Sequence, residues 1–236
     1  MGKINIDISY DMRTDSKSKD PDKYSSTLRK YHQVLWSKKL PNGNDFYLDD
    51  MVENKYLYHK SELGEFDLTS DSIIHTYFKW KRLQHIIELI PENLIKSFYD
   101  LAHTVGGYTL FPGNRIDSLN TMNQERGMNK KINDRIDLTL ECIRRYYLDE
   151  ISPLKEAIDR YNDFFALFED FKGYCEFFLM QDLVSEDYSE IKFFLPLNGF
   201  ESNPLPKDMA DYINYLNNNV DFIKRRNNRI CEYNNQ

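Results

Sequence analysis

Two neighbouring loops concentrate residue types that can hold an anion. The first loop, Phe111–Asp117 (FPGNRID), carries Arg115, and the second, Thr121–Gly127 (TMNQERG), carries Asn123 and Arg126. Guanidinium groups form paired hydrogen bonds with phosphate or carboxylate oxygens, and side-chain amides add neutral hydrogen bonds. Both loops lead toward a predicted helix start, where unpaired backbone N–H groups also favour anions. The pattern therefore predicts a pocket for a phosphate-bearing ligand, with the two arginines and Asn123 as its anion-binding residues.

The helix that follows these loops is predicted to begin near Asn129 and to end near Leu148. We expect Arg115 and Arg126 to converge at its start, with both guanidinium groups partly exposed to one concavity. The alternative is that Asn, Gly and Pro only shape the loops while the arginines pair with nearby aspartates. No P-loop or dinucleotide fingerprint is present. The ligand could therefore be a nucleotide, another phosphate-bearing small molecule or a nucleic-acid end.

Three carboxylates on the same predicted helix form the second candidate for chemistry. Asp134, Asp137 and Glu141 are spaced by three and four residues, which places them on one helical face. Such a group could act as general acid and base, or hold a hard divalent cation, and we take these three residues as the candidate catalytic groups. The alternative is a solvated face, with acids near the helix start and Arg144 and Arg145 near its end. The sequence identifies no cofactor, and no metal site is assigned.

Aromatic residues must build much of the core that positions these groups. The chain has 17 Tyr, 15 Phe and 2 Trp, or 14% aromatic residues, each of which buries a large area. The segment 161–184 (YNDFFALFEDFKGYCEFFLMQDLV) is apolar almost all round and is predicted to be the buried centre. A long amphipathic helix is predicted from about residue 206 onward. A further helix is predicted from Ser72 or Ile73 to Ile90.

The N-terminal region gives two local predictions. Residues 3–10 alternate between apolar and polar side chains, which predicts a half-buried strand. Residues 11–23 (DMRTDSKSKDPDK) are charged and nearly free of apolar side chains, and are predicted to form a mobile surface loop. Together these patterns predict an α+β fold, mostly helical, with a small mixed or antiparallel sheet packed on aromatic-rich helices. No repeat or shift of composition divides the chain, so residues 1–236 are expected to form a single domain.

Composition narrows the range of partners and compartments. The chain carries 31 Lys plus Arg against 38 Asp plus Glu, a formal net charge of −7, so bulk charge does not draw it to nucleic acid. A local basic stretch around Trp80 or in the last predicted helix could still bind one. No apolar run approaches the ~20 residues that span a bilayer, and no signal peptide is present. Three cysteines, odd in number and far apart, indicate buried thiols in a reducing, cytoplasmic compartment.

Three motifs carry a resemblance to a known family. They are FPGNRID, DRIDLTLECIRRYY (Asp134–Tyr147) and DFFALFEDFKGYCEFFLMQDLV (Asp163–Val184). With them, the chain resembles a family of uncharacterised bacterial proteins that share a domain of unknown function. The resemblance covers nearly the whole chain, which again implies one domain, and it implies no activity, cofactor or catalytic residue. Bacterial families of this kind are often associated with mobile elements or phage defence.

Two classes of function follow from these patterns. The first is an enzyme or ligand-binding protein that recognises a phosphate-bearing small molecule or a nucleic-acid end. The second is a non-catalytic interaction protein that docks a partner on its last helix or on the Trp80 stretch. A cleft that joins the two loops to the carboxylate helix would favour the first class, and a flat apolar surface around Met209 to Ile230 would favour the second.

Overall fold

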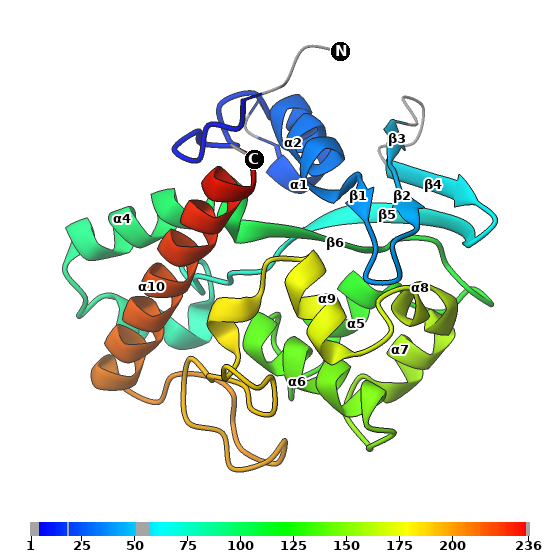
Figure 1. Ribbon diagram of the computed structural model, residues 1–236. Helices are drawn as coiled ribbons and strands as arrows, with labels where there is room; N and C mark the ends of the chain where they lie inside the picture. The colour runs from blue at the N-terminus through cyan, green and yellow to red at the C-terminus, as the bar shows by residue number, and fades with distance from the viewer. Residues whose placement is uncertain (1–4, 18, 51–56, 235–236) are drawn as a thin grey trace.

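A computed structural model of the chain describes residues 5–17, 19–50 and 57–234. Of the described residues, 46% are helical and 12% lie in strands. This confirms the predicted α+β fold, in which helix far outweighs strand. Figure 1 shows a narrow sheet with α1 and α2 on one side and α5–α9 on the other. The α-helices are α1 Pro21–Tyr24, α2 Ser26–Trp36, α3 Gln84–Ile87, α4 Glu92–Ala102, α5 Met122–Met128, α6 Ile136–Tyr147, α7 Lys155–Arg160, α8 Asn162–Ala166, α9 Phe171–Phe177 and α10 Met209–Asn234.

The sheet is antiparallel, with strand order β3-β4-β5-β6. A separate two-residue ribbon pairs β1 with β2. The strands are β1 Lys38–Lys39, β2 Asp45–Phe46, β3 Asp49–Asp50, β4 Leu57–Ser61, β5 Gly64–Ser72 and β6 Tyr108–Pro112. The end of β5 pairs with the start of β6, so that Asp71 lies opposite Thr109. Because α1 contacts β5 on one side and α8 contacts it on the other, β5 is covered on both faces.

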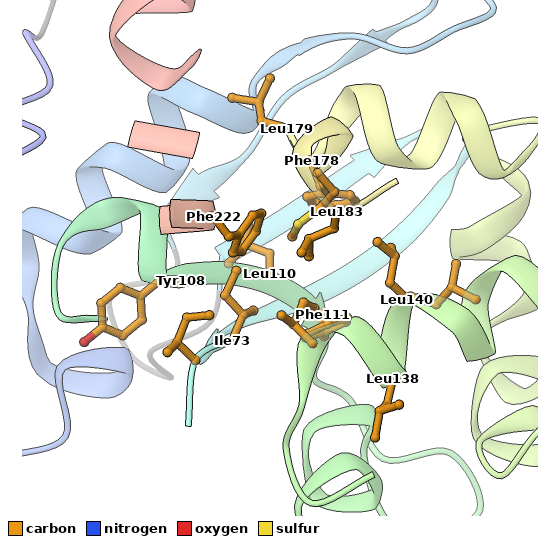
Figure 2. Packing of buried hydrophobic residues seen from close by; sticks show 14 of the residues in the cluster. Ile73, Tyr108, Leu110, Phe111, Leu138, Leu140, Phe178, Leu179, Leu183 and Phe222 are labelled. Carbon is orange, nitrogen blue, oxygen red and sulfur yellow. The ribbon is translucent and has the colours of Figure 1, made fainter. Parts of the chain in front are cut away.

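The predicted aromatic centre is confirmed. Six phenylalanines of this segment are at most 6% exposed: Phe164, Phe165, Phe168, Phe171, Phe177 and Phe178. The Phe168 ring lies 5.0 Å from that of Phe177 and 5.3 Å from that of Phe178, centroid to centroid. Figure 2 shows Leu110 and Phe111 of β6 among buried side chains from other elements, including Phe222 of α10. The helices are therefore held on the sheet by large interlocking side chains, which contribute stability through buried apolar area.

The long C-terminal helix α10 is amphipathic, as predicted. Its apolar stripe is buried, and consists of Tyr212, Tyr215, Leu216, Phe222, Ile223 and Ile230. The stripe packs against α4, α3 and the 3₁₀ turn Val105–Gly107. Among the described residues, no helix is long and apolar enough to cross a membrane.

Both predictions for the N-terminal region are wrong in the described residues. Residues 5–10 are irregular, with a turn at residues 8–9, and do not form a strand, although Ile6 is buried; residues 3–4 of the predicted strand lie outside the described residues. The segment predicted as a mobile loop is packed against the fold instead. Met12 is fully buried, and its backbone N–H donates to the carbonyl of His103 at 3.0 Å. The chain then enters α1 at Pro21, whose fixed φ suits a first helical position.

Two predicted helices are shorter than expected. The predicted helix from residue 72 to 90 is wrong, because β5 continues through Ser72 and only a 3₁₀ turn and α3 follow. The helix predicted from Asn129 begins at Ile136 instead. Asn133 and Asp134 adopt positive φ values of 48° and 59°, which a right-handed helix does not allow. The displaced helix start changes where the candidate catalytic residues lie.

Candidate functional site

Arg126 of α5 is enclosed by the fold. It is 0% exposed and forms an ion pair with Asp71 of β5. Its Nε donates to Thr139 Oγ1 at 3.0 Å, and its guanidinium lies 4.8 Å from the centre of the Phe111 ring. The expectation that both arginines expose a guanidinium to one concavity is therefore wrong for Arg126. The positive charge of Arg126 favours the ionised form of the Asp71 carboxyl group.

Arg115 and Asn123 do line a common cleft. The Arg115 side chain is exposed, and its one hydrogen bond to a described residue is a long one, 3.4 Å, from Nη2 to Gln124 Oε1. Asn123 donates through Nδ2 to the carbonyl of Ser70 at 3.4 Å, while its Oδ1 is buried and accepts no hydrogen bond from the described residues. Thr121 and Gln124 form a capping box at the start of α5, so the first amides of that short helix are already occupied.

The three predicted catalytic carboxylates do not form one site. Asp134 lies in the turn before α6, whereas Asp137 and Glu141 are buried within it. Arg135 binds Asp137 through two nitrogens, one of them at 3.0 Å, and the backbone N–H of Phe194 donates to Asp137 at 2.8 Å.

Glu141 is held just as fully by its own helix. It receives Arg144 Nε at 2.8 Å and Arg145 Nε at 2.7 Å. Asp137 and Glu141 are buried, so they do not belong to a solvated helix face, which was the alternative for these residues. Neither of them lines the cleft that Arg115 borders. Both oxygens of each carboxylate already accept hydrogen bonds from arginines, and Asp137 also from a backbone amide, so these two groups serve the fold rather than a ligand.

The cleft itself lies where α1, the end of β5, the start of the β6–α5 loop and α5 meet. Its volume is about 720 Å³, and it is bordered by Asp20, Asp22, Lys23, Asp67, Thr69, Ser70, Asp71, Gly113, Asn114, Arg115, Thr121, Asn123 and Gln124. Apart from Gly113, every residue that borders the cleft has a polar side chain. Four aspartates face two cations, Lys23 and Arg115. A cleft of this size suits a small molecule, and its polar groups suit one with several hydrogen-bonding groups.

Asp22 and Asp71 are the two cleft carboxylates whose pKa values are raised most. Asp22 is half-buried, its Oδ1 accepts no hydrogen bond, and it forms no ion pair with the described residues. Burial raises the pKa of the Asp22 carboxyl well above its usual range, and the charges of Asp71 and Asp20 raise it further. Burial also raises the pKa of the Asp71 carboxyl to about 7, against the opposing charge of Arg126. Each carboxyl group therefore keeps its proton to a higher pH than an ordinary aspartate does.

A short hydrogen-bonded chain leads from the cleft into the core. Trp36 Nε1 donates to His32 Nδ1 at 2.9 Å, and His32 Nε2 lies 2.9 Å from Ser70 Oγ. Because indole N–H can only donate, His32 Nδ1 must be the acceptor, and the ring proton must sit on Nε2. Burial and the charge of Arg226 lower the pKa of His32 to about 3, so the ring is neutral.

The hydrogen bond between His32 and Ser70 limits the chemistry open to the Ser70 hydroxyl group. Since His32 Nε2–H donates to Ser70 Oγ, the imidazole cannot act as the base that would activate the hydroxyl as a nucleophile. The Ser70 hydroxyl keeps its own proton and can donate it to a ligand in the cleft. A small cavity of about 20 Å³ adjoins the cleft beside Ser70, Asp22 and His32. That volume fits one water molecule.

Sequence reasoning missed the residues that matter most here. Asp22 and Lys23 fall in the segment predicted as a mobile loop, and Ser70 and Asp71 sit at a predicted strand–helix junction. The Asp-Pro-Asp pattern around Pro21 was a usable signal, because Pro at a first helical position fixes the aspartates at the start of a short helix. Nothing local marks Asp71 as a neighbour of Asp22. Within the described ranges, no group of three or more His, Cys, Asp or Glu is placed to hold a metal ion.

A family model matches residues 6–230, and it describes a family of unknown function, DUF6994. The chain belongs to this family. A comparison with curated proteins found no match, and neither did a comparison with solved structures. The family carries no known activity, so function rests on the chemistry of the cleft.

Proposed function

We propose that this protein binds a small, polar, hydroxyl-bearing molecule in the cleft and moves a proton to or from it. The observation that carries the proposal is the Asp22–Asp71 pair. Two neighbouring carboxylates with raised pKa values, at the wall of a cleft, are suited to general acid–base chemistry near neutral pH. In this reading the protonated member donates and the ionised member accepts.

The other cleft residues support the choice of ligand. Arg115 and Lys23 offer cationic contacts for one anionic group, such as a single phosphate or carboxylate. Asn123 and Ser70 offer neutral hydrogen bonds to hydroxyl groups. Four aspartates in the same lining oppose a polyanion, so a nucleic-acid end fits this cleft less well than a sugar monophosphate or a nucleoside monophosphate.

The interaction-protein alternative finds less support. It required an apolar surface around Met209 to Ile230, and that stripe is buried inside the fold apart from Met209, which is 44% exposed. Trp80 is half-buried, with the guanidinium of Arg82 4.3 Å from the centre of its ring. Neither region offers the flat apolar area that a docking surface needs.

A ligand screen tests the proposal. Thermal shifts should be measured with sugar monophosphates, nucleoside monophosphates, the matching unphosphorylated compounds and inorganic phosphate. A ligand at about a hundred times its dissociation constant adds ~2.7 kcal/mol to the free energy of unfolding. We expect a stabilising monophosphate whose effect is lost in Asp22→Asn and Asp71→Asn and kept in Asp221→Asn, which changes an exposed carboxylate on α10. A ligand whose effect survives both cleft substitutions would contradict the proposal.

A further inference from the structure

Lys38 is held in an unusual setting on the other side of the Ser70–His32–Trp36 chain. It follows α2 directly, and its Nζ lies 5.2 Å from the centre of the Trp36 ring, 4.7 Å from that of Phe177 and 4.7 Å from that of Tyr233. The three rings come from α2, α9 and α10, three separate parts of the chain. The amine is thus placed by tertiary packing in an aromatic cage. The residue as a whole is half-buried.

The cage contains a second cation and no acid. Arg226 of α10 is fully buried and lies 5.8 Å from the centre of the same Trp36 ring. Its guanidinium donates to four backbone carbonyls, those of Gly106, Tyr108, Phe178 and Leu179. Among the described residues, no carboxylate pairs with Lys38 and no acceptor bonds its Nζ. The neighbouring Lys39 differs in this respect, because it pairs with Asp45 at 2.7 Å.

The surroundings of Lys38 and Arg226 determine which of the two loses its proton at the lower pH. Burial and the charge of Arg226 lower the pKa of Lys38 to about 7. The aromatic faces attract an ammonium group and oppose this fall. Arg226 keeps its proton at neutral pH, with its pKa lowered by burial to about 9. The other ionisable groups packed at the cage, His32 and Tyr233, are both neutral near pH 7, because the pKa of His32 is lowered and that of Tyr233 is raised by burial. A lysine beside another cation in an apolar pocket is an activated nucleophile.

We propose that the ε-amine of Lys38 is a modification site that accepts acyl groups from small activated acyl donors such as acyl phosphates. The neutral amine attacks the carbonyl carbon of the donor and forms a C–N bond. The C–O bond to phosphate breaks, inorganic phosphate leaves with its electron pair, and the amine proton passes to water. The product amide is uncharged, so modification removes one of the two cations at Trp36 and relieves their repulsion.

The test uses acetyl phosphate on the intact, folded chain, with peptide mass spectrometry to follow Lys38 and its neighbour Lys39 separately. At about pH 7 roughly half of Lys38 is neutral, against less than about a thousandth of an ordinary lysine. Lower basicity reduces the intrinsic nucleophilicity of Lys38, so we expect a rate roughly tenfold or more above that of Lys39. The Lys38 rate should level off above about pH 8, while the Lys39 rate keeps rising.

Two controls separate the cage from the local sequence. In about 6 M urea both lysines should react at the same rate, because the cage is gone. Tyr233→Ala, which removes a half-buried ring near the end of α10 and leaves the core rings in place, should admit water and slow Lys38 toward Lys39 at neutral pH. Equal rates in the folded protein, or a Lys38 rate that still rises beyond about pH 9, would overturn the proposal. So would a Tyr233→Ala variant that remains folded and leaves the rate ratio unchanged.

Discussion

The buried carboxylates of α6, Asp137 and Glu141, and the cleft carboxylates, Asp22 and Asp71, are the same functional group in different surroundings. Asp137 and Glu141 are buried, and each is bound by arginines at hydrogen-bond distance. Asp22 and Asp71 are only partly buried, their charges repel each other, and the buried Arg126 pairs with Asp71 alone. The two carboxylates of α6 are matched by cations, whereas burial raises the pKa values of the two cleft carboxyl groups.

The difference shows how to separate structural from functional acids in this fold. Removal of one partner from a buried, fully paired carboxylate strongly destabilises the native state. A carboxylate left short of partners beside a cleft costs stability, and that cost is retained where the group serves a ligand. Four substitutions test this distinction.

Asp137→Ala should have the largest effect. The change leaves Arg135 buried at 1% exposure without its carboxylate and removes the acceptor for the backbone N–H of Phe194. Breaking a buried ion pair of this kind costs ~3–5 kcal/mol in free energy of unfolding. Urea denaturation measures the loss. The matched control is Asp221→Ala, whose pair with Arg225 on α10 is exposed and is expected to contribute at most ~1 kcal/mol. Equal losses in the two variants would contradict the structural role of Asp137.

Glu141→Gln should have an intermediate effect. The amide is the same size as the carboxylate but is neutral and can accept only on its one oxygen, so Arg144 and Arg145 both lose the charge of Glu141 and one of them also loses its acceptor. Both arginines keep some contact with water, which limits the loss to ~1–2 kcal/mol. Thermal or urea unfolding at neutral pH checks the value. A stabilised variant would place Glu141 with the cleft carboxylates instead.

Asp22→Asn should change stability in the opposite direction. Because the folded pKa values of Asp22 and Asp71 are raised, the native state holds extra protons between about pH 4 and pH 7, and the free energy of unfolding falls as the pH rises through that window. The substitution removes one of the crowded charges. We expect a gain of ~1 kcal/mol at about pH 8 and almost none near pH 4. Urea unfolding at the two pH values measures this difference. A variant that is destabilised at both pH values would show that Asp22 is a structural acid.

Arg115→Ala should leave the fold almost unchanged. Its side chain is exposed and forms one long hydrogen bond, so the stability change should stay within ~0.5 kcal/mol. The same substitution should weaken a bound monophosphate by about three- to tenfold, the value of one exposed charged contact. Calorimetry on the variant and on wild type provides the comparison. Unchanged affinity would remove Arg115 from the binding site.

Much of the fold follows from the sequence, because apolar patterning is a strong local signal. The buried phenylalanines of the segment 161–184 and the apolar stripe of α10 were both predicted from composition and spacing. The start of α6 was not, since two non-glycine residues with positive φ interrupt a helical pattern, and nothing in Asn133 or Asp134 requires that conformation.

The site was less accessible to sequence reasoning for a physical reason. Asp22 and Asp71 are 49 positions apart in the chain, and only the packing of α1 on β5 brings them together. Charged residues of a polar segment and of a strand end have ordinary local explanations. Arg115 and Asn123 were predicted correctly as neighbours because their loops are close in sequence. The burial of Arg126 depends on Asp71, a contact that spacing does not reveal.

The proposed acid–base pair of Asp22 and Asp71 is tested most directly by a ¹³C NMR titration of the aspartate carboxyl groups in the folded protein. The signals of Asp22 and Asp71 can be assigned by their loss in Asp22→Asn and Asp71→Asn. We expect the Asp71 signal to titrate with a midpoint near pH 7 and the Asp22 signal to titrate well above the range of an ordinary aspartate, with each transition broadened by the other group. Two signals that complete their titration below about pH 4.5 would show that both carboxylates are fully ionised at neutral pH, and would contradict the proposed acid–base pair.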